Sequence, residues 1–203
     1  MIWFTSDTHY YHKNIAGAKV SSWKSGYRDF ENEKEMSDCI VNTINKYVKH
    51  DDILYHLGDW SFQNLENVVN FRRRLTVREI HLCLGNHDHN IKKNKVVEKF
   101  GQYTQQQFSS VQDVIWDKIR CQEMFLSHYS HQVWPGSHKG VIHLFGHSHD
   151  TIKGIGKSMD VGIDVAYRMF SEYRPFSLEE ILDIMSKKTI AFIDHHDKQT
   201  NIR

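Results

Sequence analysis

The segment Ile80-His-Leu-Cys-Leu-Gly-Asn-His-Asp88 sets the expectation for the fold. Its apolar side chains alternate as far as Leu84, which indicates a β-strand that Gly85 closes. Directly before it, apolar residues fall at helical spacing over residues 68–75. A helix that leads into a strand followed by Asn, His and Asp is typical of an α/β fold with ligand-type residues at its strand ends.

Toward the amino terminus the sequence again predicts strands that alternate with a helix. Residues 2–5 form a short apolar run of strand type, and residues 53–57 form a second one, closed by Gly58. Between them, apolar residues at helical spacing in the charged stretch 32–50 predict an amphipathic helix. The first half of the chain therefore predicts an α/β layered fold.

Toward the carboxyl terminus the pattern changes. The polar, aperiodic stretch 105–116 predicts a loop, and three short apolar runs predict strands joined by loops at 124–126, 141–145 and 161–165. Ser177 followed by Glu180 forms a capping box, which predicts a helix as far as Met185. A last strand is predicted at 190–193, before a polar end.

The length of 203 residues predicts a single domain over residues 1–203, with enough apolar residues for a sizeable core. The 26 basic and 25 acidic residues leave a net charge of +1, which indicates neither a nucleic-acid nor a membrane partner. Three cysteines without a Cys-x-x-Cys pair argue against a disulfide framework. The first residues lack the pattern of a signal peptide, so we expect a cytoplasmic protein.

Histidine is unusually frequent, with 15 residues in the chain, and it is the commonest metal ligand. Ligand-type residues follow nearly every predicted strand. Because the carboxyl ends of parallel strands meet at one sheet edge, we expect these side chains to converge there. They are Asp7, His9, Asp59, Asn86, His87, Asp88, His128, His147 and His149.

The motifs differ in how much they prove. Asp-x-His and Gly-Asp occur by chance in a chain of this composition, whereas Gly85-Asn-His-Asp88 and Gly146-His-Ser-His149 are each expected far less than once. These two blocks therefore carry the signal. His128 competes with His131 as a ligand, and its place directly after a predicted strand favours His128.

In these blocks the chain resembles the calcineurin-like metallophosphoesterase superfamily, in particular a small bacterial and phage branch of it. The ordered blocks of that superfamily occur here from Asp7 to His149. The resemblance implies two mixed β-sheets packed as a sandwich flanked by helices, with two metal ions at the sheet edge. In two places the chain departs from the branch: Asp160 stands where Asn is common, and residues 167–173 look like an insertion that reshapes access for the substrate.

Carried over motif by motif, the resemblance implies a role for each candidate. Asp7, His9 and His149 would hold the first metal ion, and Asp59 would bridge both ions. The second ion would be held by Asn86, His128 and His147.

Such a site has a physical rationale. Two divalent ions can clamp a phosphoryl group and generate hydroxide from water at neutral pH. Nitrogen and oxygen ligands suit Mn, which we favour, and also Fe, Zn or Ni. The leaving group needs a proton, and we assign His87 as the general acid, with Asp88 able to orient it.

The sequence thus predicts a cytoplasmic dimetal phosphoesterase that acts on a small phosphate ester or a nucleotide. Phosphomonoesters and phosphodiesters remain alternatives, and nucleic-acid ends are included among the diesters. The alternative from another class is a non-catalytic metal-binding scaffold of the same fold that binds a protein partner. Members of that kind lose ligand or catalytic positions, whereas every expected position is present in this chain.

Overall fold

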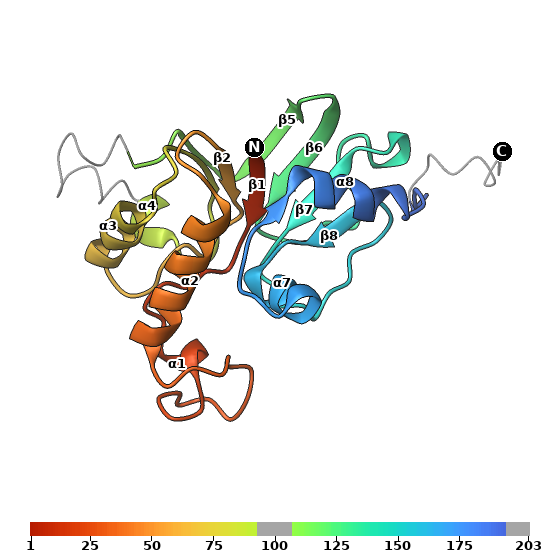
Figure 1. Cartoon of the computed structure of the whole chain (residues 1–203). Helices are drawn as coiled ribbons and strands as arrows, with labels where there is room; N and C mark the ends of the chain where they lie inside the picture. Colours follow the sequence, from red (N-terminus) through yellow and green to blue (C-terminus); the bar gives the residue numbers. More distant parts are fainter. Residues whose placement is uncertain (93–106, 194–203) are drawn as a thin grey trace.

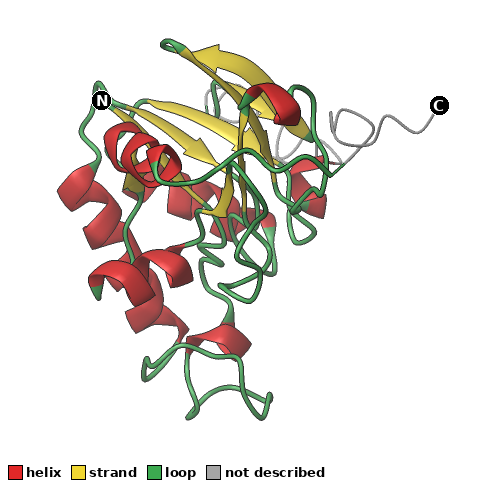
Figure 2. Ribbon diagram, turned by 90° about the vertical axis from the view of Figure 1, so that its right-hand side faces the viewer, coloured by secondary structure: helices red, strands yellow, loops and turns green. Residues whose placement is uncertain are grey.

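The computed structural model describes residues 1–92 and 107–193, and it consists of two β-sheets packed against each other with helices around them (Figures 1 and 2). The first sheet has the strand order β4-β3-β2-β1-β9, and the second has the order β5-β6-β7-β8. The strands are β1 (Ile2–Thr5), β2 (Ile53–His56), β3 (Glu79–Cys83), β4 (Ser110–Gln112), β5 (Val114–Ile119), β6 (Gln122–Ser127), β7 (Ile142–Phe145), β8 (Ser158–Asp160) and β9 (Phe176–Ser177).

Both sheets are mixed. In the first sheet β1 to β4 run parallel, and β9 joins β1 in the antiparallel direction. In the second sheet β6, β7 and β8 are parallel, and β5 is antiparallel to β6. This arrangement confirms the expected sandwich of two mixed sheets, and it turns the carboxyl ends of β1, β2, β3, β6 and β7 toward one edge.

Side-chain caps fix the starts of the longer helices. The Asn32 side chain accepts a hydrogen bond from the backbone of Glu35, and the expected capping box between Ser177 and Glu180 is present. No helix within residues 1–92 and 107–193 is long and apolar enough to cross a bilayer. The helices are α1 (Lys13–Ala16), α2 (Glu33–Tyr47), α3 (Leu65–Arg74), α4 (His89–Lys92), α7 (Ile163–Phe170) and α8 (Leu178–Ser186), with a short 3₁₀ helix at Ser137–Lys139.

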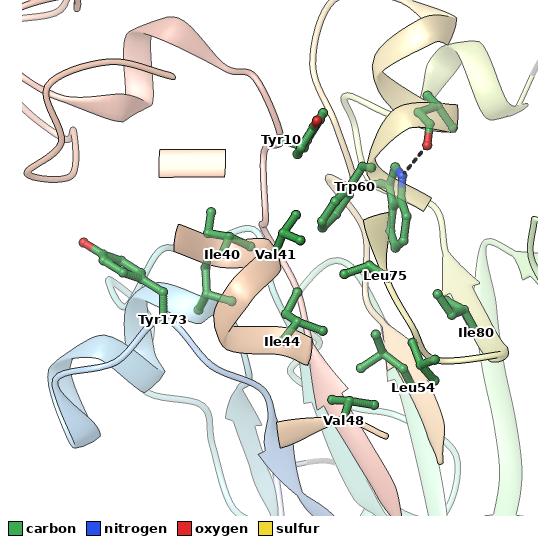
Figure 3. Packing of buried hydrophobic residues seen from close by; sticks show 14 of the residues in the cluster. Tyr10, Ile40, Val41, Ile44, Val48, Leu54, Trp60, Leu75, Ile80 and Tyr173 are labelled. Atoms are coloured by element: carbon green, nitrogen blue, oxygen red, sulfur yellow. Dashed lines mark hydrogen bonds between the residues drawn. The ribbon is translucent and has the colours of Figure 1, made fainter. Parts of the chain in front are cut away.

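The first sheet has a core on each face because its side chains alternate between the two. On one face Trp3 and Leu54 pack under α2 and α3, where Ile44 and Trp60 complete a buried cluster (Figure 3). On the other face Phe4 belongs to the core between the sheets, together with side chains of the second sheet and of α8. The strands that carry the candidate site residues are therefore held from both sides.

The predicted strand at 161–165 is wrong. Strand β8 ends at Asp160, and the chain enters α7 at Ile163. The apolar run arises because Ile163, Val165 and Ala166 form the buried face of a helix, and a short apolar run does not distinguish a buried strand from a buried helical turn.

Two further expectations are corrected. The predicted loop at 105–116 contains β4 and the start of β5, although Gln105 and Gln106 lie outside the described residues. Strand β5 lies at the sheet edge and exposes Val114, Trp116 and Lys118. Its sequence therefore lacks the regular alternation of apolar and polar residues that would indicate a strand. Residues 190–193 form no strand. Their apolar composition alone suggested one, yet the large side chains of Phe192 and Ile193 are exposed.

Candidate metal centre

The structure brings the nine predicted site residues to one edge of the sandwich. Asp7 and His9 follow β1, and Asp59 follows β2. The loop after β3 supplies the next three residues, the end of β6 supplies one, and the loop after β7 supplies the last two. These six are Asn86, His87, Asp88, His128, His147 and His149.

The first group of possible metal donors consists of Asp7, His9 and His149. The Nε2 atoms of His9 and His149 lie 3.3 Å apart, and each is 3.9 Å from Asp7 Oδ1. Asp7 and His9 come from the first sheet, whereas His149 comes from the second. Their donor atoms therefore converge on one point between the sheets.

The second group consists of Asp59, His128 and His147, which again combines the two sheets. His128 Nε2 lies 3.5 Å from Asp59 Oδ2 and 3.0 Å from Asn86 Oδ1. The competing His131 is elsewhere, since its backbone N–H donates to His143 on the outer side of the second sheet. The preference for His128 at this edge agrees with the structure.

Asp59 lies between the two groups. Its Oδ2 atom is 3.5 Å from Nε2 of His9, in the first group, and 3.5 Å from Nε2 of His128, in the second. The side chain is almost fully buried, so its charge is little screened by water. A carboxylate in this position can face two cations at once.

The tautomer of His128 indicates that a cation fits the second group. Its Nδ1 donates to the carbonyl of Leu57 at 2.8 Å, because a carbonyl oxygen can only accept. Burial lowers the pKa of His128, so the ring is neutral and Nε2 carries a lone pair. That lone pair faces the oxygens of Asn86 and Asp59, which are also acceptors. A shared cation satisfies all three atoms.

The first group has the electrostatics of a cation site as well. Burial raises the pKa of Asp7 well above its usual range, and burial lowers the pKa of His9 well below its usual range. His9 therefore presents a neutral imidazole, the form that binds metal ions. A divalent cation would stabilise the ionised form of Asp7, which burial disfavours.

The backbone at the candidate ligands is strained. A positive φ is uncommon for residues other than glycine, and it is typically tolerated only where the surrounding structure enforces it. Five of the seven predicted ligands adopt φ values between 45° and 64°: Asp7, His9, Asp59, His147 and His149. Such clustering is characteristic of functional sites.

Gly146 allows the two sheets to approach each other at this edge. A Cβ atom on this residue would lie 2.3 Å from Ser6 Oγ and 2.5 Å from Asp7 Oδ2. Both distances are too short for any side chain. The next residue, His147, donates its backbone N–H to the Asp7 carboxylate at 2.9 Å. The glycine therefore lets the loop after β7 bind directly to the carboxylate after β1.

His87 lies at the rim of the site. Its side chain is 34 % exposed, and its Nε2 atom is 3.9 Å from Asp59 Oδ2. The ring also contacts the rings of His9 and Phe62, with centroids 5.3 Å and 5.2 Å away. Asp59, His9 and His87 together form a further possible donor group. The geometry thus places His87 beside the candidate metal site and in reach of solvent.

Asp88 does not have the role expected for it. Both of its carboxylate oxygens accept hydrogen bonds from backbone N–H groups, namely those of Asp59, Trp60 and Gly85, at 2.8 to 3.0 Å. The carboxylate therefore holds two loops together. Its hydrogen bonds go to their backbone and not to the His87 ring. Adjacency in the sequence suggested a contact between Asp88 and the His87 ring, but the hydrogen-bond partners of this carboxylate are backbone N–H groups.

Asp160, the departure noted in the sequence, holds the loop after β7 in a similar way. It accepts hydrogen bonds from Ser148 Oγ at 2.5 Å and from the backbone of Gly162 at 2.6 Å. Ser148 lies between the candidate ligands His147 and His149. The carboxylate thus fixes the loop that presents both of them.

Sequence reasoning missed two residues of the site, Arg28 and Asp164. The Asp164 carboxylate accepts a hydrogen bond from His149 Nδ1 at 2.7 Å and a pair of hydrogen bonds from the buried Arg28. Neither residue lies in a recognisable motif, and they are 136 positions apart. A single sequence carries no signal that would pair them.

A cavity of about 470 Å³ adjoins the first donor group at His149. Tyr27, Tyr167 and Tyr173 line it, so the segment 167–173 does border the space next to the site. This segment is the end of α7 and the turn that follows it. A larger cavity of about 880 Å³, lined by Asp52 and other residues, lies at the opposite end of the sheet and contacts neither donor group.

Comparison with known proteins agrees with this geometry. A family model described as calcineurin-like phosphoesterase matches residues 1–201. The chain belongs to this family. The family is one of metal-dependent phosphoesterases, so the two donor groups lie in the setting in which divalent ions are expected.

Two relatives resemble the chain along most of its length. The uncharacterized protein MJ1445 of Methanocaldococcus jannaschii is 27% identical over 198 residues, which cover 94% of each chain. A crystal structure of a protein of unknown function from Aquifex aeolicus, AQ665, matches with a TM-score of 0.60 and 23% identity. The match covers 91% of this chain and 98% of that one, and it shows the fold.

Proposed function

We propose that this calcineurin-like phosphoesterase hydrolyses phosphate esters with two divalent metal ions and with His87 as the general acid. The position of Asp59, 3.5 Å from a histidine of each donor group, is the observation that carries the proposal. One ion would be held by Asp7, His9 and His149 and the other by Asn86, His128 and His147, with Asp59 as the ligand shared by both. When bound, the ions would neutralise phosphoryl oxygens and supply an activated water as the nucleophile.

The protein's own residues prepare this site before any substrate binds. Asp59 and Asp7 contribute two negative charges, which leaves a surplus of positive charge when two dications are present. That surplus matches the charge of a phosphate ester. Neutral histidines such as His9 and His128 add donor atoms without reducing it.

His87 is suited to protonate the leaving group. It lies beside Asp59 and is accessible to solvent, so an ester oxygen next to the donor groups can be within its reach. The cavity at His149 offers room for the rest of the substrate. We propose Mn as the natural metal, with Fe, Zn and Ni as alternatives, because all of these accept mixed nitrogen and oxygen ligands.

The proposal is tested by removing and restoring metal. Protein treated with a chelator should lose turnover on a panel of aryl phosphomonoesters, aryl phosphodiesters, nucleotides and oligonucleotides. Addition of Mn²⁺ should restore it, and the panel identifies the preferred ester class. Full turnover in metal-free protein would exclude the dimetal mechanism.

A further inference from the structure

Arg28 is a buried charged side chain directly behind the first donor group. Its side chain is only 3% exposed. Its Nη2 atom donates to the backbone carbonyl of Asp7 at 2.7 Å, and Nη1 donates to the carbonyl of Thr8 at 3.3 Å. The guanidinium therefore holds the backbone that carries the first candidate ligand.

The same guanidinium also reaches the last candidate ligand, through a carboxylate. Nε and Nη2 of Arg28 donate to the two oxygens of Asp164 at 2.7 and 2.9 Å. Asp164 Oδ2 in turn accepts the Nδ1 hydrogen of His149 at 2.7 Å. Arg28 and Asp164 thus connect the backbone at Asp7 with the ring of His149.

The carboxylate determines how His149 presents itself. Because Nδ1 donates its hydrogen to Asp164, Nε2 is the nitrogen left to bind a metal ion, and it faces Asp7 and His9. A carboxylate on the far nitrogen also makes a histidine a stronger metal ligand. Burial alone would raise the pKa of Asp164, but the charge and hydrogen bonds of Arg28 outweigh burial and hold this pKa far below its usual value.

We propose that Arg28 and Asp164 are positioning residues that set the affinity of the first donor group for its metal ion. The inference rests on the proposed function, since it assumes that Asp7, His9 and His149 bind an ion. In the second group a different contact orients the histidine, namely the hydrogen bond from His128 to the carbonyl of Leu57. Loss of the Arg28 and Asp164 pair should therefore weaken one ion and spare the other.

Arg28 lies in the loop between α1 and α2, and backbone hydrogen bonds join the two ends of this loop. The backbone of Arg28 donates to the carbonyl of Ile15 at 2.8 Å, and that of Phe30 donates to Ala16 at 3.0 Å. At Gly17, the first residue of the loop, a Cβ atom would lie 1.9 Å from the carbonyl oxygen of Phe30. The two ends of the loop are thus held close together, which fixes the position of the Arg28 guanidinium.

Titration of metal-free protein with Mn²⁺ tests the inference, with bound and free Mn²⁺ measured by electron paramagnetic resonance. The parent protein should bind two ions. Asp164→Asn, which keeps the size of the side chain but removes its charge, should bind one ion roughly 10- to 100-fold more weakly and the other with unchanged affinity. Arg28→Lys should show the same selective loss, because a lysine cannot bind Asp164 and the carbonyls of Asp7 and Thr8 at the same time.

A matched pair elsewhere in the chain separates positioning from general stability. Arg174 is also buried and donates two hydrogen bonds, of 3.1 and 2.6 Å, to Glu180. Glu180→Gln should lower the thermal unfolding midpoint while both Mn²⁺ affinities stay unchanged. In a His149→Ala background, Asp164→Asn should weaken Mn²⁺ binding no further, because its effect passes through that ring.

The outcomes distinguish the two proposals. A parent protein that binds fewer than two Mn²⁺ ions would contradict the dimetal function itself. A parent that binds two ions, with Asp164→Asn and Arg28→Lys binding both as tightly, would overturn the positioning role alone. Equal weakening of both ions would also overturn it, because the effect would then be a general loss of structure.

Discussion

The backbone N–H of Asp59 donates a hydrogen bond of 2.8 Å to the carboxylate of Asp88. Because Asp88 also accepts hydrogen bonds from Gly85 and Trp60, it joins the loop after β2 to the loop after β3. These loops carry the proposed bridging ligand and the proposed general acid. The relative position of Asp59 and His87 therefore depends on a buried carboxylate that binds backbone N–H groups.

Asp88→Asn should destabilise the protein by about 1 to 3 kcal/mol, because the amide replaces an acceptor oxygen with a donor that faces backbone N–H groups. Urea denaturation of the metal-free protein measures this loss. Asp113→Asn is the control, since Asp113 is exposed and pairs with Lys92 on the surface. A free energy of unfolding as high in Asp88→Asn as in the parent would show that these hydrogen bonds do not hold the two loops together.

His87→Ala should reduce turnover about 10²- to 10⁴-fold for alkyl or nucleoside esters, because their alkoxide leaving groups need a proton. A nitrophenyl ester, whose leaving group is a weak base, should lose much less. Both rates are compared at matched metal loading. The neighbouring His89→Ala, an exposed histidine at the start of α4, should behave like the parent.

Two results would refute the role of His87 as the acid. Equal losses on the two ester types would mean that the ring positions the phosphate. Loss of an ion would mean that His87 is itself a ligand, as the donor group of His9, Asp59 and His87 permits.

Asp59→Ala should lower the metal content below two ions per chain, because it removes the carboxylate that lies 3.5 Å from a histidine of each donor group and leaves two cations with less negative charge near them. Elemental analysis after extensive dialysis measures the content. His147→Ala removes a donor from one group alone, so it should affect a single ion. Two tightly held ions in Asp59→Ala would rule out the bridge.

His143 should make stability depend on pH at a place remote from the candidate metal site. Burial lowers the pKa of His143 from 6.5 to about 4, so the folded protein binds this proton more weakly than the unfolded chain does. Its contribution is therefore present above pH 6.5 and is lost as the pH falls toward about 4, to a total of about 3 kcal/mol. His143 Nε2 accepts the backbone N–H of His131, and protonation removes that acceptor.

Unfolding free energies measured between pH 7 and pH 4 test this expectation. The slope should be shallower in His143→Gln than in the parent. Other buried histidines, including His56, titrate in the same direction, so only the difference between variant and parent belongs to His143. Parallel slopes for the parent and His143→Gln would show that His143 is not the responsible group.

The sequence revealed those parts of the molecule in which local pattern and final environment agree. Strands buried on both faces, such as β1 and β2, appear as apolar runs, and the capping box at Ser177 marks the start of α8. Strand β5 escaped notice because one side of it faces solvent. The sequence predicted a strand at the start of α7, because the apolar residues of this short helix are too few to show the helical repeat.

The candidate site divides along similar lines. The proposed ligands lie in short motifs whose residue types report their chemistry, so their convergence could be foreseen. Arg28 and Asp164 act through contacts between distant segments, and the role of Asp88 depends on how a turn directs its side chain. Such tertiary contacts have no counterpart in local composition.

The first and second donor groups each take side chains from both sheets, as Asp7 with His149 and Asp59 with His128 illustrate. A bound ion therefore cross-links the sandwich at one edge, and its binding free energy is coupled to the packing of the core between the sheets. The coupling runs in both directions. A substitution at a core residue such as Phe4 or Leu126 would weaken ion binding from a distance, so the loss of ions from a variant would not by itself identify a ligand.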